Sequence, residues 1–164
     1  MLHYVAVSLS LHFAEHIKKM SKKKILFLCT QNAARSQMAE GFVNARYGDR
    51  YEAYSAGSEP TEVHRCAVAV MAEVGIEISA HRAKSLDVFD GASFDYVATM
   101  CADAQENCPI FPGGTAYLHH AFADPLLPLV TDSDSCASFR HVRNEIREWI
   151  ELTFGDQETI ARTD

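Results

Sequence analysis

Apolar residues fall in two kinds of segment along the chain, and the two kinds alternate. Strand-like segments are short, and their apolar residues are continuous or occupy every second position. They cover residues 25–28, 51–55, 94–100 and 116–120. The first is apolar at every position, which is typical of a strand buried on both faces of a sheet. We therefore expect four strands.

The remaining apolar segments have helical spacing. Helices are predicted over residues 33–47, 60–74, 85–89 and 138–152. The last is the most clearly amphipathic, with Phe139, Val142 and Ile146 on one side and charged residues on the other. We expect Thr61 to cap the second helix and Gly75 to end it.

Alternating strands and helices predict an α/β fold with a parallel sheet. We expect three layers, a four-stranded parallel sheet with helices on both faces, in one domain over residues 22–154. Residues 1–21 are expected to be an extension, disordered or loosely helical and without a function, and residues 155–164 a frayed tail. Ligands of such sheets bind beyond the carboxyl ends of the strands, where Cys29 and Cys101 fall.

Composition and charge exclude several classes of protein and of binding partner. The chain has 164 residues with 48% hydrophobic and 23% charged residues, which excludes disordered, collagen-like and polytopic membrane proteins. The net charge is −7, and an acidic body repels nucleic acid and anionic membranes, so we expect neither as a partner. Five cysteines, an odd number, argue against a secreted disulfide framework and favour the reducing cytoplasm.

A loop that fits a tetrahedral oxyanion follows the first strand. Cys29 and Arg35 flank five residues that lead into a helix, so backbone N–H groups and the helix N-terminus can surround an anion. Arg35 can add a bidentate fork, and the same positive field stabilises the thiolate of Cys29 as a nucleophile. Asn32 can adopt the left-handed conformation that curls the loop, and Ser36 can hydrogen-bond the thiolate. The predicted substrate-binding residues are Thr30, Gln31, Asn32, Ala33, Ala34, Arg35 and Ser36.

A late Asp124-Pro125 pair adds a candidate general acid, although such a pair alone is more often only a turn. Together with the strand, the Cys-x5-Arg-Ser loop and the helix, it resembles the low-molecular-weight protein tyrosine phosphatases. The resemblance implies that Cys29 is the nucleophile, Arg35 binds the oxyanion and Asp124 is the acid. Leu126 stands where these phosphatases usually have tyrosine after the Asp-Pro pair, so an aromatic wall for a phenyl ring is missing there.

Two further cysteines, Cys101 and Cys108, lie near the end of the third strand. A phosphatase needs neither, whereas a reductase could use both to carry a disulfide away from Cys29. The alternatives are inert buried cysteines or a zinc pair, for which His119 and His120 are the nearest further ligands. Through these three cysteines, the loop and the Asp-Pro pair, the chain resembles the thioredoxin-coupled arsenate reductases over residues 25–150.

This second resemblance implies a cytoplasmic enzyme that reduces arsenate to arsenite, with phosphate or sulfate as substrate analogues. It implies a relay through Cys29, Cys101 and Cys108, regenerated by thioredoxin, and a segment between the last two cysteines that can unwind. A glutaredoxin route would use the same cysteines. We expect a monomer without a cofactor. The alternatives are a phosphatase acting on phosphotyrosine or another phosphomonoester, and a non-catalytic oxyanion-binding or redox-sensing module.

The same family places potassium near the loop in some members, and Glu40 and Ser55 match two of its ligands. Lys84 stands where a further acidic ligand is expected, so we predict no metal site and an ion pair between Lys84 and Glu40. Cys66 and Cys136 are expected to be structural or incidental.

Overall fold

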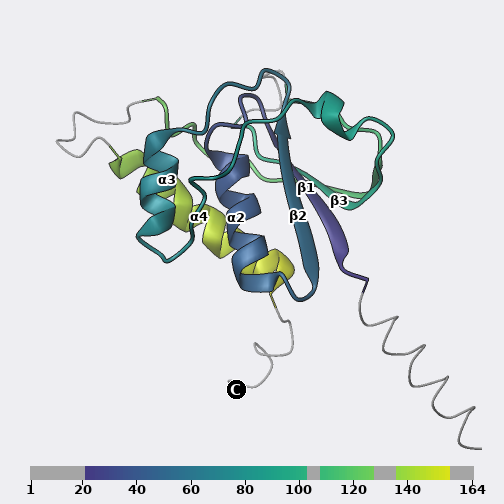
Figure 1. The fold of residues 1–164 in the computed structure, drawn as a ribbon, viewed down its shortest axis with the longest axis horizontal. Coiled ribbons are helices and arrows are strands. Elements are labelled where there is room, and N and C mark those ends of the chain that lie inside the picture. The colour runs from purple at the N-terminus through teal and green to yellow at the C-terminus, as the bar shows by residue number, and fades with distance from the viewer. Residues whose placement is uncertain (1–20, 103–107, 128–135, 156–164) are drawn as a thin grey trace, which may run out of the picture.

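The chain folds around a parallel sheet (Figure 1). The computed structural model describes residues 21–102, 108–127 and 136–155. The strands are β1 (Lys23–Cys29), β2 (Tyr51–Gly57), β3 (Phe94–Thr99) and β4 (Gly114–His119), in the spatial order β2-β1-β3-β4. The helices are α2 (Arg35–Tyr47), α3 (Arg65–Ala72), the 3-10 helix η1 (Leu86–Phe89) and α4 (Ala137–Phe154). All neighbouring strands are parallel, which confirms the predicted fold class.

Some sequence-based expectations lie outside the described residues. These are residues 1–20 of the expected extension, residues 156–164 of the expected tail and residues 103–107 of the segment expected to unwind. Within the described part of the chain, no helix has the length and apolar character needed to cross a membrane.

β1 is the strand that positions the candidate site. It lies between β2 and β3, and its residues Ile25 to Leu28 are completely buried. In the register of the sheet, Cys29 pairs with Gly57 of β2, and Leu28 pairs with Thr99 of β3. The carboxyl ends of three strands therefore meet at one edge of the sheet.

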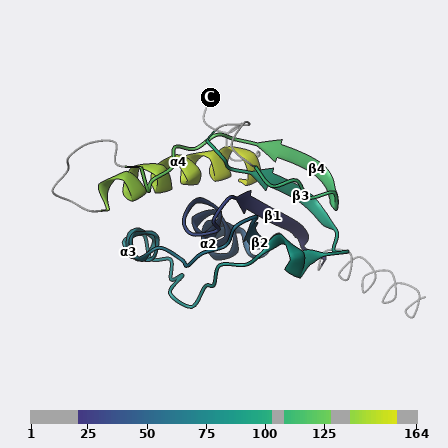
Figure 2. The same ribbon diagram turned by 90° about the horizontal axis from the view of Figure 1, so that it is seen from above.

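Both faces of the sheet are covered, by different kinds of element. α2, α3 and α4 pack together on one face, while η1 and the loops beside it cover the other (Figures 1 and 2). Alternate residues of β1 point to the two sides, because successive side chains of a strand face opposite ways. Ile25 and Phe27 enter the larger helical core, and Leu26 and Leu28 enter the smaller core with Phe111.

The second helix begins later than predicted. α3 starts at Arg65, and its N-cap is His64, whose ring Nδ1 accepts a hydrogen bond from the backbone N–H of Cys66 at 3.2 Å. Thr61 is not the cap, because it lies four positions before α3 begins, and its N–H donates to the carbonyl of Gln31 at 3.1 Å. The segment before α3 lies along the loop after β1, and this contact replaces the first helical turn.

Candidate active site

The loop after β1 has the curled form that oxyanion binding requires. Cys29 ends β1 and Arg35 begins α2, and Asn32 between them has φ = 50°, the predicted left-handed conformation. The carbonyls of Thr30, Gln31 and Ala33 accept hydrogen bonds from the backbone N–H groups of Glu59, Thr61 and His64, respectively. These bonds fix the carbonyls toward the segment before α3, so the loop's own N–H groups can bind an anion.

Gly57 lets this loop approach β2. A Cβ atom at position 57 would lie 2.4 Å from the carbonyl oxygen of Thr30 and 2.9 Å from the backbone nitrogen of Asn32. Neither backbone atom can move without changing the curl of the loop. A glycine at the end of β2 is therefore part of what shapes the anion site.

Ser36 lies against the candidate nucleophile. Its Oγ is 2.8 Å from the Sγ of Cys29, and the side-chain amide of Asn32 donates to the same Oγ at 2.8 Å. Because Ser36 accepts from Asn32, its own hydroxyl hydrogen is free to point at the sulfur. Cys29 is the free cysteine of the chain and is only 2% exposed. This arrangement can stabilise a thiolate.

A second layer of side chains holds Asn32, and the sequence reasoning missed it. Gln37 donates through Nε2 to the side-chain oxygen of Asn32 at 2.8 Å and to its carbonyl at 3.1 Å. The Nδ1 of His81 lies 2.9 Å from Oε1 of Gln37, which requires the proton on Nδ1. Burial lowers the pKa of His81, which keeps the ring neutral. No sequence signal singled out Gln37, because its partners lie up to 45 positions away.

Arg35 lies close to Asp124 in the structure. Arg35 donates to the carbonyl of Phe122 at 3.2 Å, and its Nη2 is 3.9 Å from the carboxylate of Asp124. The side chain of Arg35 is 8% exposed and that of Asp124 is 27% exposed. The loop that contains Asp124 is thus held over the oxyanion loop, with the carboxyl group open to solvent on one side.

Cys101 and Cys108 form a disulfide. Cys101 follows β3, where the N–H of Met100 donates to the carbonyl of Leu28 at 2.8 Å, so it lies level with the start of the oxyanion loop. Cys101 is completely buried, and Cys108 is partly exposed. In this state the two sulfurs are bonded to each other, so they are not the free thiolate pair that zinc requires.

The predicted ion pair at the expected potassium position is present. The Nζ of Lys84 lies 3.3 Å from Oε2 of Glu40, and the hydroxyl of Ser55 donates to the same oxygen. The side chain of Glu40 is 13% exposed, so its carboxylate needs a partner. The ammonium of Lys84 supplies the positive charge that a cation would otherwise bring.

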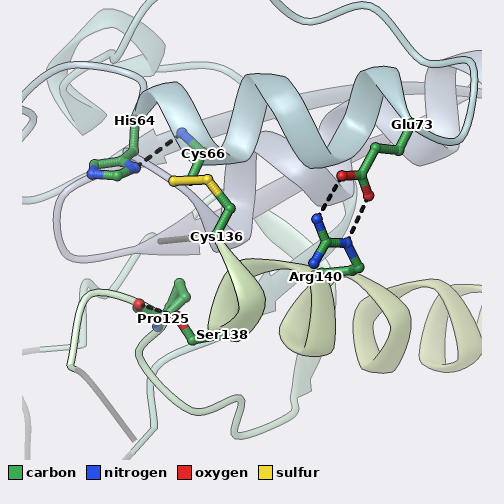
Figure 3. Close-up of a disulfide and its surroundings, with 7 residues drawn as sticks. All are labelled: His64, Cys66, Glu73, Pro125, Cys136, Ser138 and Arg140. Carbon is green, nitrogen blue, oxygen red and sulfur yellow. Dashed lines mark hydrogen bonds and ion pairs between the residues drawn. A yellow bond between two sulfur atoms is a disulfide. The ribbon is translucent and has the colours of Figure 1, made fainter. Parts of the chain in front are cut away.

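Cys66 and Cys136 form a second disulfide, which no sequence argument predicted (Figure 3). The pair is separated by 70 positions, so spacing could not reveal it. Four of the five cysteines are bonded in two disulfides and one is free, so an odd cysteine count does not exclude disulfides within this chain. This disulfide is not part of the oxyanion loop.

Comparison with known proteins agrees with this geometry. Residues 24–154 match the family model described as low molecular weight phosphotyrosine protein phosphatase. The arsenate reductase of Halalkalibacterium halodurans is 42% identical over 137 residues, which cover 84% of this chain and 98% of that protein. Arsenate reductase 1 of Staphylococcus epidermidis is 41% identical over 132 residues, covering 80% of this chain and 96% of that protein.

Solved structures give the same result. An arsenate reductase in the phosphate binding state has a TM-score of 0.63 and 29% identity, covering 87% of this chain and 99% of that one. A thioredoxin-dependent arsenate reductase of Corynebacterium glutamicum has a TM-score of 0.56 and 30% identity, covering 82% of this chain and 64% of that one. A low molecular weight protein tyrosine phosphatase from T. tengcongensis has a TM-score of 0.60 and 29% identity, covering 81% of this chain and 98% of that one. With the loop, the sheet and these relatives in agreement, the chain belongs to the low molecular weight phosphotyrosine protein phosphatase family and groups there with arsenate reductases.

Proposed function

We propose that the protein reduces arsenate to arsenite through Cys29, Cys101 and Cys108, with thioredoxin as electron donor. The observation that carries the proposal is a Cys101–Cys108 disulfide at the sheet edge that also holds the free Cys29. The relatives named arsenate reductase and the thioredoxin-dependent neighbour support it.

The first step forms a covalent adduct. Arsenate lies in the oxyanion loop, bound by backbone N–H groups and the fork of Arg35. The thiolate of Cys29, held by Ser36, attacks arsenic and forms a sulfur–arsenic(V) bond. Asp124 donates a proton to the departing oxygen, which leaves as water.

The second step transfers the electrons. The thiolate of Cys101 attacks the sulfur of Cys29, and the sulfur–arsenic bond breaks with its electron pair going to arsenic. Arsenic(V) becomes arsenic(III), arsenite leaves, and a Cys29–Cys101 disulfide remains. The thiolate of Cys108 then attacks Cys101 and releases Cys29 as a thiolate.

In the structure Cys101 is bonded to Cys108 and Cys29 is free, which is the disulfide pattern expected at the end of this cycle. Cys108 is the more accessible sulfur of the pair, because Cys101 is completely buried. An external dithiol would therefore attack Cys108, displace Cys101 as a thiolate and then close its own disulfide, which returns both cysteines to the reduced form.

An assay with thioredoxin, thioredoxin reductase and NADPH tests the proposal. Arsenate should cause continuous NADPH oxidation with wild type and none with Cys29→Ser. A parallel reaction with glutathione, glutaredoxin, glutathione reductase and NADPH tests the donor, and we expect it to be slower. Absence of arsenate-dependent NADPH oxidation with both donors would contradict the proposal.

The alternative is a phosphomonoester phosphatase, favoured by the T. tengcongensis neighbour and by an oxyanion loop that suits phosphate equally well. Cys101→Ser separates the two functions, because a phosphatase does not need this thiol. Rapid hydrolysis of p-nitrophenyl phosphate by Cys101→Ser, without arsenate reduction by wild type, would establish the alternative.

We further propose that the enzyme acts as a monomer in the cytoplasm, where thioredoxin is available. Light scattering coupled to size exclusion measures the first property, and fractionation of the source cells measures the second. A stable dimer, or recovery outside the cytoplasm, would contradict the respective statement.

A further inference from the structure

The Cys66–Cys136 disulfide joins the beginnings of two helices (Figure 3). Cys66 lies in the first turn of α3, and Cys136 is the N-cap residue of α4. Cys66 is 1% exposed, whereas Cys136 is partly exposed. An external thiol can therefore approach the bond from the side of Cys136.

Each cysteine of this disulfide lies two positions from a residue that supports the active site. On the α3 side, the N–H of His64 donates to the carbonyl of Ala33 in the oxyanion loop at 2.9 Å. On the α4 side, the hydroxyl of Ser138 donates to the carbonyl of Pro125 at 2.9 Å, directly after Asp124. The disulfide thus links the support of the oxyanion loop to the support of the acid loop.

Ring packing strengthens the same link. The imidazole of His64 stacks on Phe139, with ring centroids 4.5 Å apart and an angle of 15° between the planes. Phe139 is the residue after Ser138 and is buried in the core. A shift at the beginning of α4 would therefore move Ser138 and disturb His64 together.

A second connection keeps α3 and α4 together when the disulfide is open. Glu73, just after α3, accepts hydrogen bonds from Arg140 at 2.6 and 2.9 Å and from Arg143 at 2.9 Å. Arg143 also donates to the carbonyl of Val70 at 2.7 Å. Opening the disulfide should therefore loosen the helix beginnings without unfolding the protein.

The position of both sulfurs at helix N-termini makes the bond reducible. A helix N-terminus stabilises a thiolate, and a stabilised thiolate is a better leaving group in thiol–disulfide exchange. An incoming dithiol would attack Cys136 and expel Cys66 as a thiolate, and its second thiol would then release Cys136. Glutathione disulfide can restore the bond, since each of its two sulfurs accepts one electron and leaves as a thiol.

We propose that Cys66–Cys136 is a redox-modification site that controls the position of Asp124 over the oxyanion loop. The oxidised form holds the acid in place, and the reduced form lets the acid loop move away. This inference rests on the proposed function only in assigning Asp124 as the acid, and it does not require the arsenate relay.

The test compares the two redox states of this disulfide. Wild type, Cys66→Ser, Cys136→Ser and the double variant are equilibrated in glutathione buffer or in dithiothreitol. Alkylation and peptide mass mapping record which cysteines are bonded and verify that Cys29 is free. Hydrolysis of p-nitrophenyl phosphate, which needs Cys29, Arg35 and Asp124, is followed together with a single turnover of arsenate.

In glutathione buffer we expect both single variants and the double variant to have the same kcat, about tenfold below wild type, with KM changed less. Wild type should fall to that value in dithiothreitol. The decrease of kcat at high pH, which reports deprotonation of the general acid, should become weaker. A loss of folded protein alone would lower kcat at every pH without changing this dependence. Glu73→Gln, which removes the ion pairs of the other connection but keeps the hydrogen bond from Arg143 to the carbonyl of Val70, should keep the full dependence on redox state.

Equal kcat values for wild type and the variants in glutathione buffer would overturn the inference, as would a Cys66–Cys136 bond that dithiothreitol fails to open in the folded protein. Failure of the proposed function has a different signature. In that case arsenite is absent for every variant and both redox states, while p-nitrophenyl phosphate hydrolysis still depends on the disulfide.

Discussion

Ser36 is the residue whose role the geometry defines most narrowly. It accepts from Asn32 and contacts the sulfur of Cys29, so it supplies a directed donor to the nucleophile. A hydrogen bond to a charged group contributes about 1.5–3 kcal/mol, which corresponds to roughly a 10- to 150-fold change in rate. Ser36→Ala should therefore lower the rate of arsenate reduction by that factor.

The same variant should lower the rate at which iodoacetamide alkylates Cys29. Ser58→Ala, at an exposed position just after β2, is the control and should leave both rates unchanged. A wild-type rate of arsenate reduction for Ser36→Ala would show that Ser36 does not support the nucleophile.

Lys84 gives a prediction about ions. Because its ammonium pairs with Glu40, exchanging potassium for sodium should change neither the melting temperature nor kcat of the wild type. Lys84→Asp removes this charge and adds a carboxylate, so potassium should then stabilise the variant. Thermal unfolding in the two salts measures both effects. A large increase in the melting temperature of wild type in potassium relative to sodium would contradict the prediction.

At the scale of elements, Glu73 connects α3 to α4, and hydrogen bonds from Arg140 lower its pKa from 4.5 to about 2. A carboxylate with a lowered folded-state pKa stabilises the protein above pH 4.5, and this stabilisation is lost as the pH falls from 4.5 toward 2. Glu73→Gln should therefore be less stable than wild type at neutral pH, and the difference should shrink as the pH falls through this range.

Urea unfolding at a series of pH values measures this difference. Glu151→Gln is the matched control, because its pair with Arg147 is exposed at an N–O distance of 3.9 Å and should contribute little. A stability difference between Glu73→Gln and wild type that stays constant with pH would contradict the lowered pKa of Glu73.

Local sequence patterns predicted most of the helices and strands, and they predicted that the oxyanion loop lies between the first strand and the helix after it. The apolar run of β1 and the spacing of α4 depend on burial, which sequence periodicity records directly. The beginning of α3 was not predictable, because residues before it bond to the loop at Gln31 instead of starting the helix. Gln37 and the Cys66–Cys136 pair were missed for the same reason, since their contacts join segments distant in the sequence.

At the scale of the whole molecule, an acidic protein concentrates its anion-binding groups at one sheet edge. The net charge is −7, yet Arg35, the oxyanion loop and the N-terminus of α2 lie together where β1 ends. The register of β1 and β3 brings Cys101 to the same edge. The proposed relay depends on this placement, because its cysteines come from separate parts of the chain.

The most direct test of the relay counts arsenite and traps the disulfide in reduced Cys108→Ser, mixed with excess arsenate and no electron donor. We expect about one arsenite per enzyme and a Cys29–Cys101 disulfide in the peptide map, because the thiol that would attack Cys101 is missing. Wild type under the same conditions should end with Cys101 bonded to Cys108. Arsenite formed by Cys108→Ser without any bond between Cys29 and Cys101 would contradict the relay.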